Sequence, residues 1–148
     1  MLNNEKGFTL VEILVSLTLL TTIVLAASYF FSQSNTISSY NNQKLVAVNL
    51  ARSTLERIQL EPSSYITNGI AGSPYSFQSC QASGGSSCQN YRVLINNHEY
   101  AIDVALSQDN NEKDLKLVDI QVDVSLTSSD KSIKSTVEGY IANDSILP

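Results

Sequence analysis

The first part of the chain is a long apolar run. Residues 8–31 are apolar apart from a few hydroxyl-bearing side chains, and Glu12 is the only charged residue among them. As an α-helix this run would be roughly 36 Å long at about 1.5 Å per residue, enough to cross a hydrocarbon core about 30 Å thick. Serine and threonine hydroxyls are tolerated in such a helix because they can donate hydrogen bonds to carbonyls one turn earlier. The pattern predicts a membrane-spanning helix over residues 8–31.

The helical pattern continues beyond the apolar run. Residues 32–61 are more polar but contain neither glycine nor proline. Their larger aliphatic residues recur at a spacing close to one helical face. These residues are Ile37, Leu45, Val48, Leu55 and Ile58. Pro62 disfavours helical geometry at the residue before it. We therefore predict one helix from about residue 9 to about residue 60, whose second half, residues 32–61, is amphipathic.

Residues 62–90 have a different composition. Serine, glycine, asparagine, glutamine and proline dominate this stretch, which is typical of turns and loops. We predict a variable connector between the helix and the rest of the chain. Its larger apolar residues would hold it in place: Tyr65, Ile70, Tyr75 and Phe77. Two interpretations are open for this segment, a contact surface for a partner and an irregular loop that crosses the edge of a sheet.

Residues 91–148 alternate between apolar and polar positions, as strands do. The strand-like segments are residues 91–95, 100–106, 118–126 and 133–141. A polar turn is expected at residues 96–99, between the first two. A four-stranded antiparallel sheet with one apolar face needs a cover, and the apolar stripe of the helix can supply it. The predicted fold is α+β: a long N-terminal helix packed on a four-stranded antiparallel sheet.

The charge is unevenly distributed. The chain has a net charge of −5. Charges cancel between Phe8 and Glu61, whereas five basic and ten acidic residues follow from Pro62 onward (5 − 10 = −5). An acidic C-terminal part without a stripe of basic residues argues against nucleic-acid binding. We therefore expect no nucleic-acid partner.

Cys80 and Cys88 are the only cysteines, and Gly84 and Gly85 between them let the chain reverse direction. A structural disulfide is the favoured interpretation, and an oxidising location outside the cytoplasm would support it. A pair of free thiols is the alternative. A metal site at this spacing would lack two further ligands.

The chain shows little sign of catalytic chemistry. His98 is the only histidine, and we expect it to be a solvated turn residue. Residues 109–114 resemble a calcium loop in their acidity, but they lack the glycine and the distal glutamate of the EF-hand pattern. We expect an acidic, solvated loop there. No phosphate-binding loop, nucleophile elbow or cluster of metal ligands occurs in the sequence, so no enzyme activity, cofactor or metal is predicted.

The arrangement at the N-terminus is unlike that of a secretory signal. A secretory signal is cut after its apolar core, but here the short polar leader, residues 1–7, precedes the core. Cleavage at Gly7 would leave the core in the mature protein. A carboxylate near the start of a membrane helix costs roughly 2.5–3.5 kcal/mol on insertion scales, so Glu12 requires a partner.

The segment Gly7-Phe8-Thr9-Leu10-Val11-Glu12, with residues 13–17 after it, resembles the N-terminus of type IV prepilins and type II secretion pseudopilins. The resemblance implies that a prepilin peptidase cuts after Gly7 and that Phe8 becomes N-methylated. It further implies that Glu12 meets the terminal amine of a neighbouring subunit in a helical filament.

The resemblance also implies that this α+β fold is pilin-like, and it implies a biological setting. The expected function is a structural subunit of a type IV pilus, and residues 51–56 and 127–131 are similar to minor pilins of the V/I kind. The expected partners are the prepilin peptidase and N-methyltransferase, other pilin or pseudopilin subunits, and an assembly platform in the inner membrane. The expected location is the bacterial cytoplasmic membrane, crossed once with the C-terminal lobe outside, and then the filament. The alternatives are a secretion or competence pseudopilin and a binding subunit at the filament tip; a membrane-tethered enzyme finds no support in the residues.

Overall fold

A computed structural model describes residues 7–85, 88–127 and 132–145 of the chain. The chain forms two compact units, Met1–Asn41 and Asn42–Pro148, and the long helix α1 contributes residues to both. We refer to the second unit as the lobe.

Helix α1 runs from Leu10 to Leu60 without interruption, as predicted. It ends where the Glu61 amide donates to the Arg57 carbonyl over 2.8 Å, immediately before Pro62. In the first unit every described residue from 7 to 39 is exposed. By length and composition α1 can cross a membrane.

The hydroxyl groups within the apolar run are satisfied by the helix itself. Ser16 donates to the Glu12 carbonyl over 2.8 Å, and four further hydroxyls make equivalent bonds to a carbonyl three or four residues earlier. These four belong to Thr18, Thr21, Thr22 and Ser28. The polar atoms of these side chains therefore need no water or protein partner, which suits them to an apolar environment.

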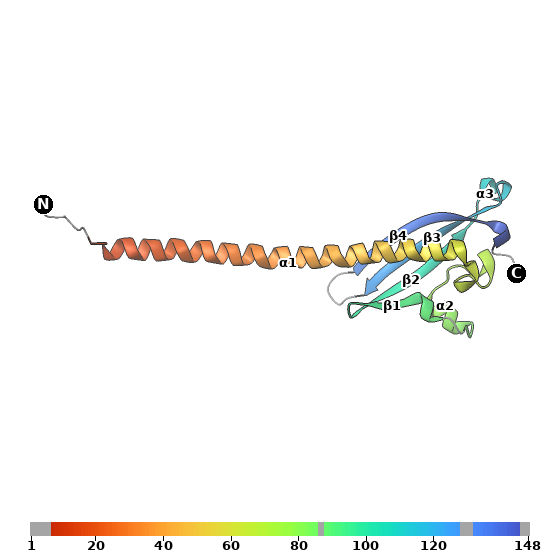
Figure 1. Ribbon diagram of the computed structural model, residues 1–148, viewed down its shortest axis with the longest axis horizontal. Helices are drawn as coiled ribbons and strands as arrows, with labels where there is room; N and C mark the ends of the chain where they lie inside the picture. The colour runs from red at the N-terminus through yellow and green to blue at the C-terminus, as the bar shows by residue number, and fades with distance from the viewer. Residues whose placement is uncertain (1–6, 86–87, 128–131, 146–148) are drawn as a thin grey trace. The chain divides into compact units, whose positions relative to one another are not determined.

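The lobe contains a four-stranded antiparallel sheet in the order β1-β2-β3-β4, which confirms the predicted fold class (Figure 1). The strands are Arg92–Ile95, His98–Ser107, Leu117–Thr127 and Ser132–Ala142. The turn between β1 and β2 is tighter than the predicted turn at residues 96–99. It uses only Asn96 and Asn97, whose φ angles of 51° and 64° give the two-residue hairpin that favours asparagine.

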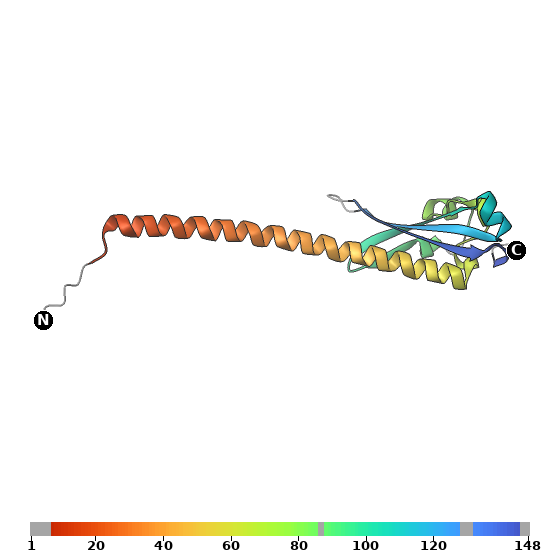
Figure 2. The same ribbon diagram turned by 90° about the horizontal axis from the view of Figure 1, so that it is seen from above.

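The core of the lobe lies between the sheet and residues 42–60 of α1, which run along one face of the sheet (Figure 2). Alternate residues of β2, β3 and β4 point into this core. The side chains with less than 2% of their surface exposed include Tyr100, Ile102, Ile120, Leu126 and Ile133. The pattern of alternation in the sequence thus identified the buried face of the sheet correctly.

The predicted apolar stripe of α1 is partly wrong. Leu55 and Ile58 are buried as expected, but Leu45 is 59% exposed and Ile37 is 53% exposed. The helix residues in the core are Ala47, Ala51, Thr54, Leu55 and Ile58. Small side chains line the contact because the helix approaches the sheet closely. At Gly139 of β4, a Cβ atom would lie only 2.8 Å from Cδ2 of Leu55.

The segment between α1 and the sheet is more regular than predicted. It contains the 3₁₀ turns η1 (Pro62–Ser64), η2 (Gly69–Gly72) and η3 (Cys88–Tyr91), and helix α2 (Phe77–Ala82). Of the four residues predicted to hold the segment in place, Tyr65 and Tyr75 are buried, whereas Ile70 and Phe77 are only half-buried. The Tyr75 backbone exchanges two hydrogen bonds of 2.7 and 2.8 Å with Val104. The segment therefore lies along the edge of β2, beyond the end of β1.

Candidate functional site

The first turn of α1 has a defined cap. Residues 7–9 are not helical, and the Glu12 amide donates to Oγ1 of Thr9 over 3.3 Å. The Ile13 amide donates to the Thr9 carbonyl, also over 3.3 Å. Thr9 is therefore the N-cap of the helix, and Glu12 occupies the third helical position. The spacing Thr-x-x-Glu is the sequence signature of a capping box, a signal that the sequence analysis did not use.

The capping box of α1 is only half closed. In α3 (Asn110–Asp114), Asp109 and Glu112 each accept the backbone N–H of the other, both over 2.6 Å. In α1 only the bond to the Thr9 hydroxyl is made. Among the residues that the structure describes, the Glu12 carboxylate has neither a hydrogen bond nor an ion pair within 4.0 Å. The helix dipole favours an anion at this end, but the carboxylate remains available for a cation.

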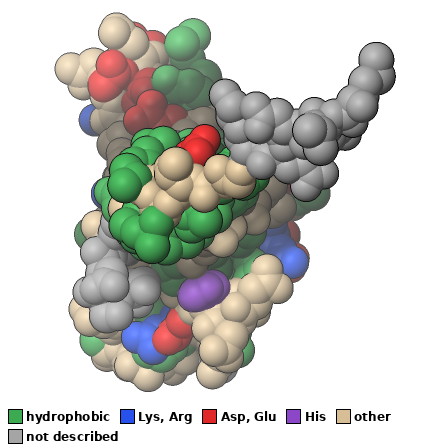
Figure 3. Space-filling view, turned by 90° about the vertical axis from the view of Figure 1, so that its left-hand side faces the viewer, with side chains coloured by type: hydrophobic (Ala, Val, Ile, Leu, Met, Phe, Trp, Pro, Cys, Tyr) green, Lys and Arg blue, Asp and Glu red, His purple; other side chains and the backbone are tan. Residues whose placement is uncertain are grey.

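The surroundings of Glu12 are apolar and exposed. Phe8 is 80% exposed, and none of the described residues lies within 4 Å of the position that a Cβ atom would take at Gly7. Figure 3 looks at the structure from the N-terminal side of Figure 1 and shows hydrophobic side chains gathered around the near end of the helix. A soluble protein rarely exposes a continuous apolar surface of this extent. The arrangement can provide an apolar contact surface and one unpaired acid within it.

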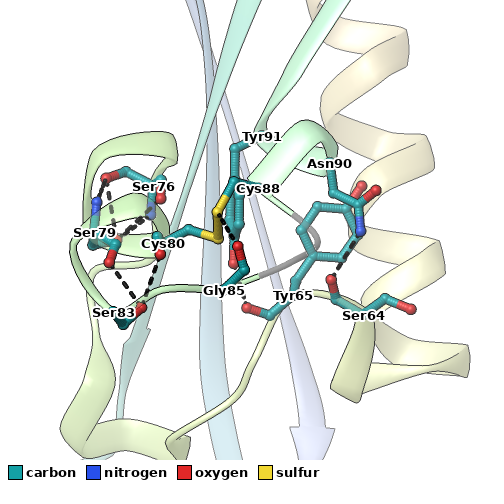
Figure 4. The surroundings of a disulfide bond; sticks show 10 residues. All are labelled: Ser64, Tyr65, Ser76, Ser79, Cys80, Ser83, Gly85, Cys88, Asn90 and Tyr91. Atoms are coloured by element: carbon teal, nitrogen blue, oxygen red, sulfur yellow. Dashed lines mark hydrogen bonds between the residues drawn. A yellow bond between two sulfur atoms is a disulfide. The ribbon is translucent and has the colours of Figure 1, made fainter.

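Cys80 and Cys88 form a disulfide with an S–S distance of 2.04 Å, which confirms the favoured interpretation over free thiols. The bond joins α2 to η3, with Ser76, Ser79 and Ser83 on one side and Tyr65 and Tyr91 on the other (Figure 4). Gly85 is required here, because a Cβ atom would lie 2.8 Å from Sγ of Cys80.

Three tyrosines pack beside the disulfide. The rings of Tyr65 and Tyr91 meet edge to face at 5.6 Å, and the Tyr91 hydroxyl donates to the Tyr65 carbonyl over 2.5 Å. Burial raises the pKa of Tyr91 to about 12, and the neighbouring Tyr75 and Tyr65 hydroxyls add to this increase. The Tyr91 hydroxyl therefore stays protonated at physiological pH, and its hydrogen bond to Tyr65 supports the structure.

Two other candidates take a different place from the one expected. His98 is not a solvated turn residue, because it begins β2 and is half-buried, with Nε2 3.2 Å from Nε2 of Gln43 on α1. The acidic stretch 109–114 is not a loop, because it forms the N-cap and body of α3. In the described part of the chain, no group of three or more His, Cys, Asp or Glu residues could hold a metal ion.

The outer face of the sheet brings together two acids that the sequence analysis did not connect. Asp103 of β2 lies directly opposite Asp123 of β3. Asp123 is paired with Lys134 over 3.2 Å and accepts a hydrogen bond from Thr136. Desolvation, and then the charge of Asp123, raise the pKa of Asp103, while Lys134 lowers it. The alternation in the sequence puts both acids on the outer face, but only the strand register makes them neighbours.

Comparison with known proteins connects the N-terminal segment to one family. Residues 2–28 match the family described as the prokaryotic N-terminal methylation motif. No curated protein sequence and no solved structure matches the chain. The chain therefore carries a type IV prepilin-like signal, and Gly7, Phe8, Thr9 and Glu12 all lie within the matched range. The motif supports a protein of the type IV pilin or pseudopilin type, a structural class that a prepilin peptidase processes and that assembles with other pilins.

Proposed function

We propose that this chain is a minor structural subunit of a type IV pilus or pilus-like filament. A prepilin peptidase cleaves it after Gly7, its new terminal residue Phe8 is N-methylated, and it assembles through α1. The observation that carries the proposal is the Glu12 carboxylate, which has no partner among the described residues and lies in the first turn of an exposed apolar helix, within a prepilin-like signal.

Cleavage would create the partner that Glu12 lacks. Before cleavage the backbone nitrogen of Phe8 is an uncharged amide; afterwards it is a cationic amine, and N-methylation leaves it cationic. Two opposite charges attract far more strongly in an apolar environment than in water. The amine of one subunit and Glu12 of the next can therefore form an ion pair that neither makes in the precursor. This pair would set the axial register between neighbouring helices.

Assembly changes the environment of α1 rather than its conformation. In the membrane, residues 8–31 would face lipid, and in the filament they would face equivalent helices. Lipid tails are about as apolar as leucine side chains, so the exchange is nearly neutral in apolar burial. The ion pair is then the main term that favours the filament. By its prepilin-like signal we further propose an inner-membrane assembly platform and other pilins as partners, with the lobe on the outer side of the cytoplasmic membrane.

Two substitutions test the proposal in the native host. Gly7→Ala should leave the leader attached, as mass spectrometry of the N-terminus would show. Glu12→Gln keeps the shape of the side chain and removes its charge, so it should allow cleavage but prevent incorporation into sheared filaments. Glu56→Gln is the matched control, because Glu56 is an exposed acid of the same helix. Normal incorporation of the Glu12→Gln chain would overturn the proposed role of the carboxylate.

A second candidate function is a binding subunit at the filament tip. The observation that favours it is a cavity of about 380 Å³ beside the disulfide. Its lining includes Tyr91 and, from the predicted variable connector 62–90, Thr67, Asn68 and Tyr75. A contact surface is one of the two interpretations left open for that connector. Replacing both Cys80 and Cys88 with serine should spare assembly but abolish attachment if this cavity recognises a target. If the double serine variant assembles normally and still attaches, the cavity does not recognise a target, and the role of the lobe is structural.

A secretion or competence pseudopilin remains the alternative within the same family, because it would share the anchor and the assembly mechanism. Deletion of the chain's gene separates the two. Loss of surface attachment or twitching motility would indicate a pilus subunit, whereas loss of protein export or DNA uptake would indicate a pseudopilin.

A further inference from the structure

We propose that Thr9 is a positioning residue for processing: as the N-cap of α1 it keeps the Gly7–Phe8 peptide bond outside the helix, where a peptidase can bind it. This inference rests on the proposed cleavage after Gly7. The inference goes beyond the proposed cleavage because it assigns a role to Thr9, a residue that neither forms the scissile bond nor pairs with the new amine.

The structure places the helix boundary just beyond the scissile bond. Helix α1 begins at Leu10, and residues 7–9, which precede it, are not helical. Thr9 makes the boundary, because its hydroxyl accepts the Glu12 N–H, one of the first amides of the helix that no earlier carbonyl satisfies. Gly7 and Phe8 are exposed, and no described residue comes within 4 Å of a Cβ atom placed at Gly7. The scissile bond is therefore accessible and its backbone groups are available.

A helix that began earlier would hide the bond. Peptide-binding sites commonly recognise an extended backbone through main-chain hydrogen bonds. In a helix, the same backbone N–H and C=O groups are hydrogen-bonded to each other and cannot bind a peptidase. Upstream of Thr9, the next residues with side chains that favour the N-cap position are Asn3 and Asn4. A helix capped there would include both Gly7 and Phe8. Gly7 opposes this extension through its poor helix propensity, so Thr9 and Gly7 act in the same direction.

The role of Thr9 differs from that of the other threonines of α1. The hydroxyls of Thr18, Thr21 and Thr22 donate to carbonyls within the helix. The Thr9 hydroxyl instead accepts an amide proton at the end of the helix. Valine has the shape of threonine without the hydroxyl, so it removes the cap at position 9 but no cap at position 22. Serine keeps the accepting oxygen. Thr9→Val, Thr9→Ser and Thr22→Val therefore form a matched set.

The experiment measures cleavage of the full-length precursor by purified prepilin peptidase in detergent micelles, with the product identified by its N-terminal mass. Loss of the cap should shift the equilibrium between precursor with a non-helical scissile bond and precursor with a helical one about fivefold toward the helical form, which corresponds to about 1 kcal/mol. A smaller competent fraction weakens apparent binding by the same factor. Thr9→Val should therefore raise KM, by at most about fivefold, with little change in kcat, while Thr9→Ser and Thr22→Val should match the unmodified chain.

A second measurement separates this effect from damage to the peptidase contact. Amide hydrogen exchange at Phe8 should slow in full-length Thr9→Val precursor without peptidase, because the helix extends over it. Equal KM values for Thr9→Val and Thr9→Ser would overturn the inference, as would a change in kcat alone or unchanged exchange at Phe8. If the unmodified precursor is not cut after Gly7 at all, the proposed function fails instead, and the two failures are thereby distinguished.

Discussion

The two units of the chain handle apolar surface in opposite ways. In the lobe, alternate strand residues and a face of small helix residues close over one another, and side chains such as Val122 and Ile120 are completely buried. In the first unit no described residue from 7 to 39 is buried, although this segment is the most apolar of the chain. Its hydroxyls are nevertheless satisfied internally. The lobe is thus complete in itself, whereas the first unit is suited to an apolar environment that other molecules supply.

The test with the largest expected effect compares one aliphatic residue from each unit. Ile58 is fully buried in the lobe, so Ile58→Ala should lower the free energy of unfolding of the lobe by roughly 2–5 kcal/mol. Leu20, 59% exposed in the first unit, should show no measurable effect when changed to alanine. Urea unfolding of the full chain in detergent, followed by near-ultraviolet circular dichroism of the lobe tyrosines, measures both. A large effect of Leu20→Ala would contradict the independence of the units.

The disulfide provides the second test. Replacing both Cys80 and Cys88 with alanine should lower the free energy of unfolding by roughly 2–3 kcal/mol, because the unfolded chain regains the freedom of the closed loop. The same substitutions should not affect the apolar segment, residues 8–31. The detergent concentration needed to extract the chain from membranes should therefore be unchanged. If the double variant unfolds at the urea concentration of the unmodified chain, the loop adds nothing to the stability of the lobe.

A smaller effect is expected where α1 approaches β4. Gly139→Ala would put a Cβ atom 2.8 Å from Cδ2 and 3.1 Å from Cδ1 of Leu55. Overpacking of this kind costs roughly 1–3 kcal/mol, and the lower end applies here because a leucine side chain can shift. The cost should largely disappear in a Leu55→Ala background, where the clashing atoms are absent. A double-mutant cycle by urea unfolding measures the coupling, and additive costs would show that the close approach is not what Gly139 serves.

These contrasts also show what could be predicted from the sequence. The bounds of α1 and the strands follow from local patterns, namely the absence of glycine and proline and the alternation of apolar and polar residues. The helix face that packs in the core was harder to predict, because Ala47 and Ala51 are less hydrophobic than Leu45, which is exposed. How closely a helix approaches a sheet is a property of the packed lobe, so no local pattern reports it.

In the candidate site, too, some features follow from the local sequence and others depend on the folded structure. The apolar run, Glu12 and the pair Cys80 and Cys88 stand out in the sequence because each is unusual by type or context. The neighbouring pair Asp103 and Asp123 could not be predicted, because it depends on the register between β2 and β3. The half-closed capping box at Thr9 depends on which of two possible hydrogen bonds forms, and the spacing alone does not decide that.

The smallest predicted effect concerns the outer face of the lobe. The folded pKa of Asp103 is raised, chiefly by desolvation and then by Asp123, so the folded lobe binds this proton more tightly than the unfolded chain. The charged form of Asp103 therefore opposes folding at neutral pH. Stability should increase as the pH falls through the region between the unfolded and folded pKa values. Asp103→Asn should raise the free energy of unfolding at pH 7 by about 0.3–0.5 kcal/mol, because the site is partly exposed and Lys134 offsets part of the repulsion.

The pH profile distinguishes this electrostatic effect from a change in packing. The stabilisation by Asp103→Asn should disappear at acidic pH, where Asp103 is protonated in both the folded and the unfolded chain. Asp119→Asn is the matched control, since Asp119 lies on the same face of β3 but opposite Ser107, whose hydroxyl donates to it over 3.4 Å. Asp119→Asn should not raise the free energy of unfolding at pH 7, because it removes the charged acceptor of the Ser107 hydrogen bond and relieves no repulsion between acids. A gain from Asp103→Asn that is equal at pH 7 and at acidic pH would show that repulsion between the two acids is not its source.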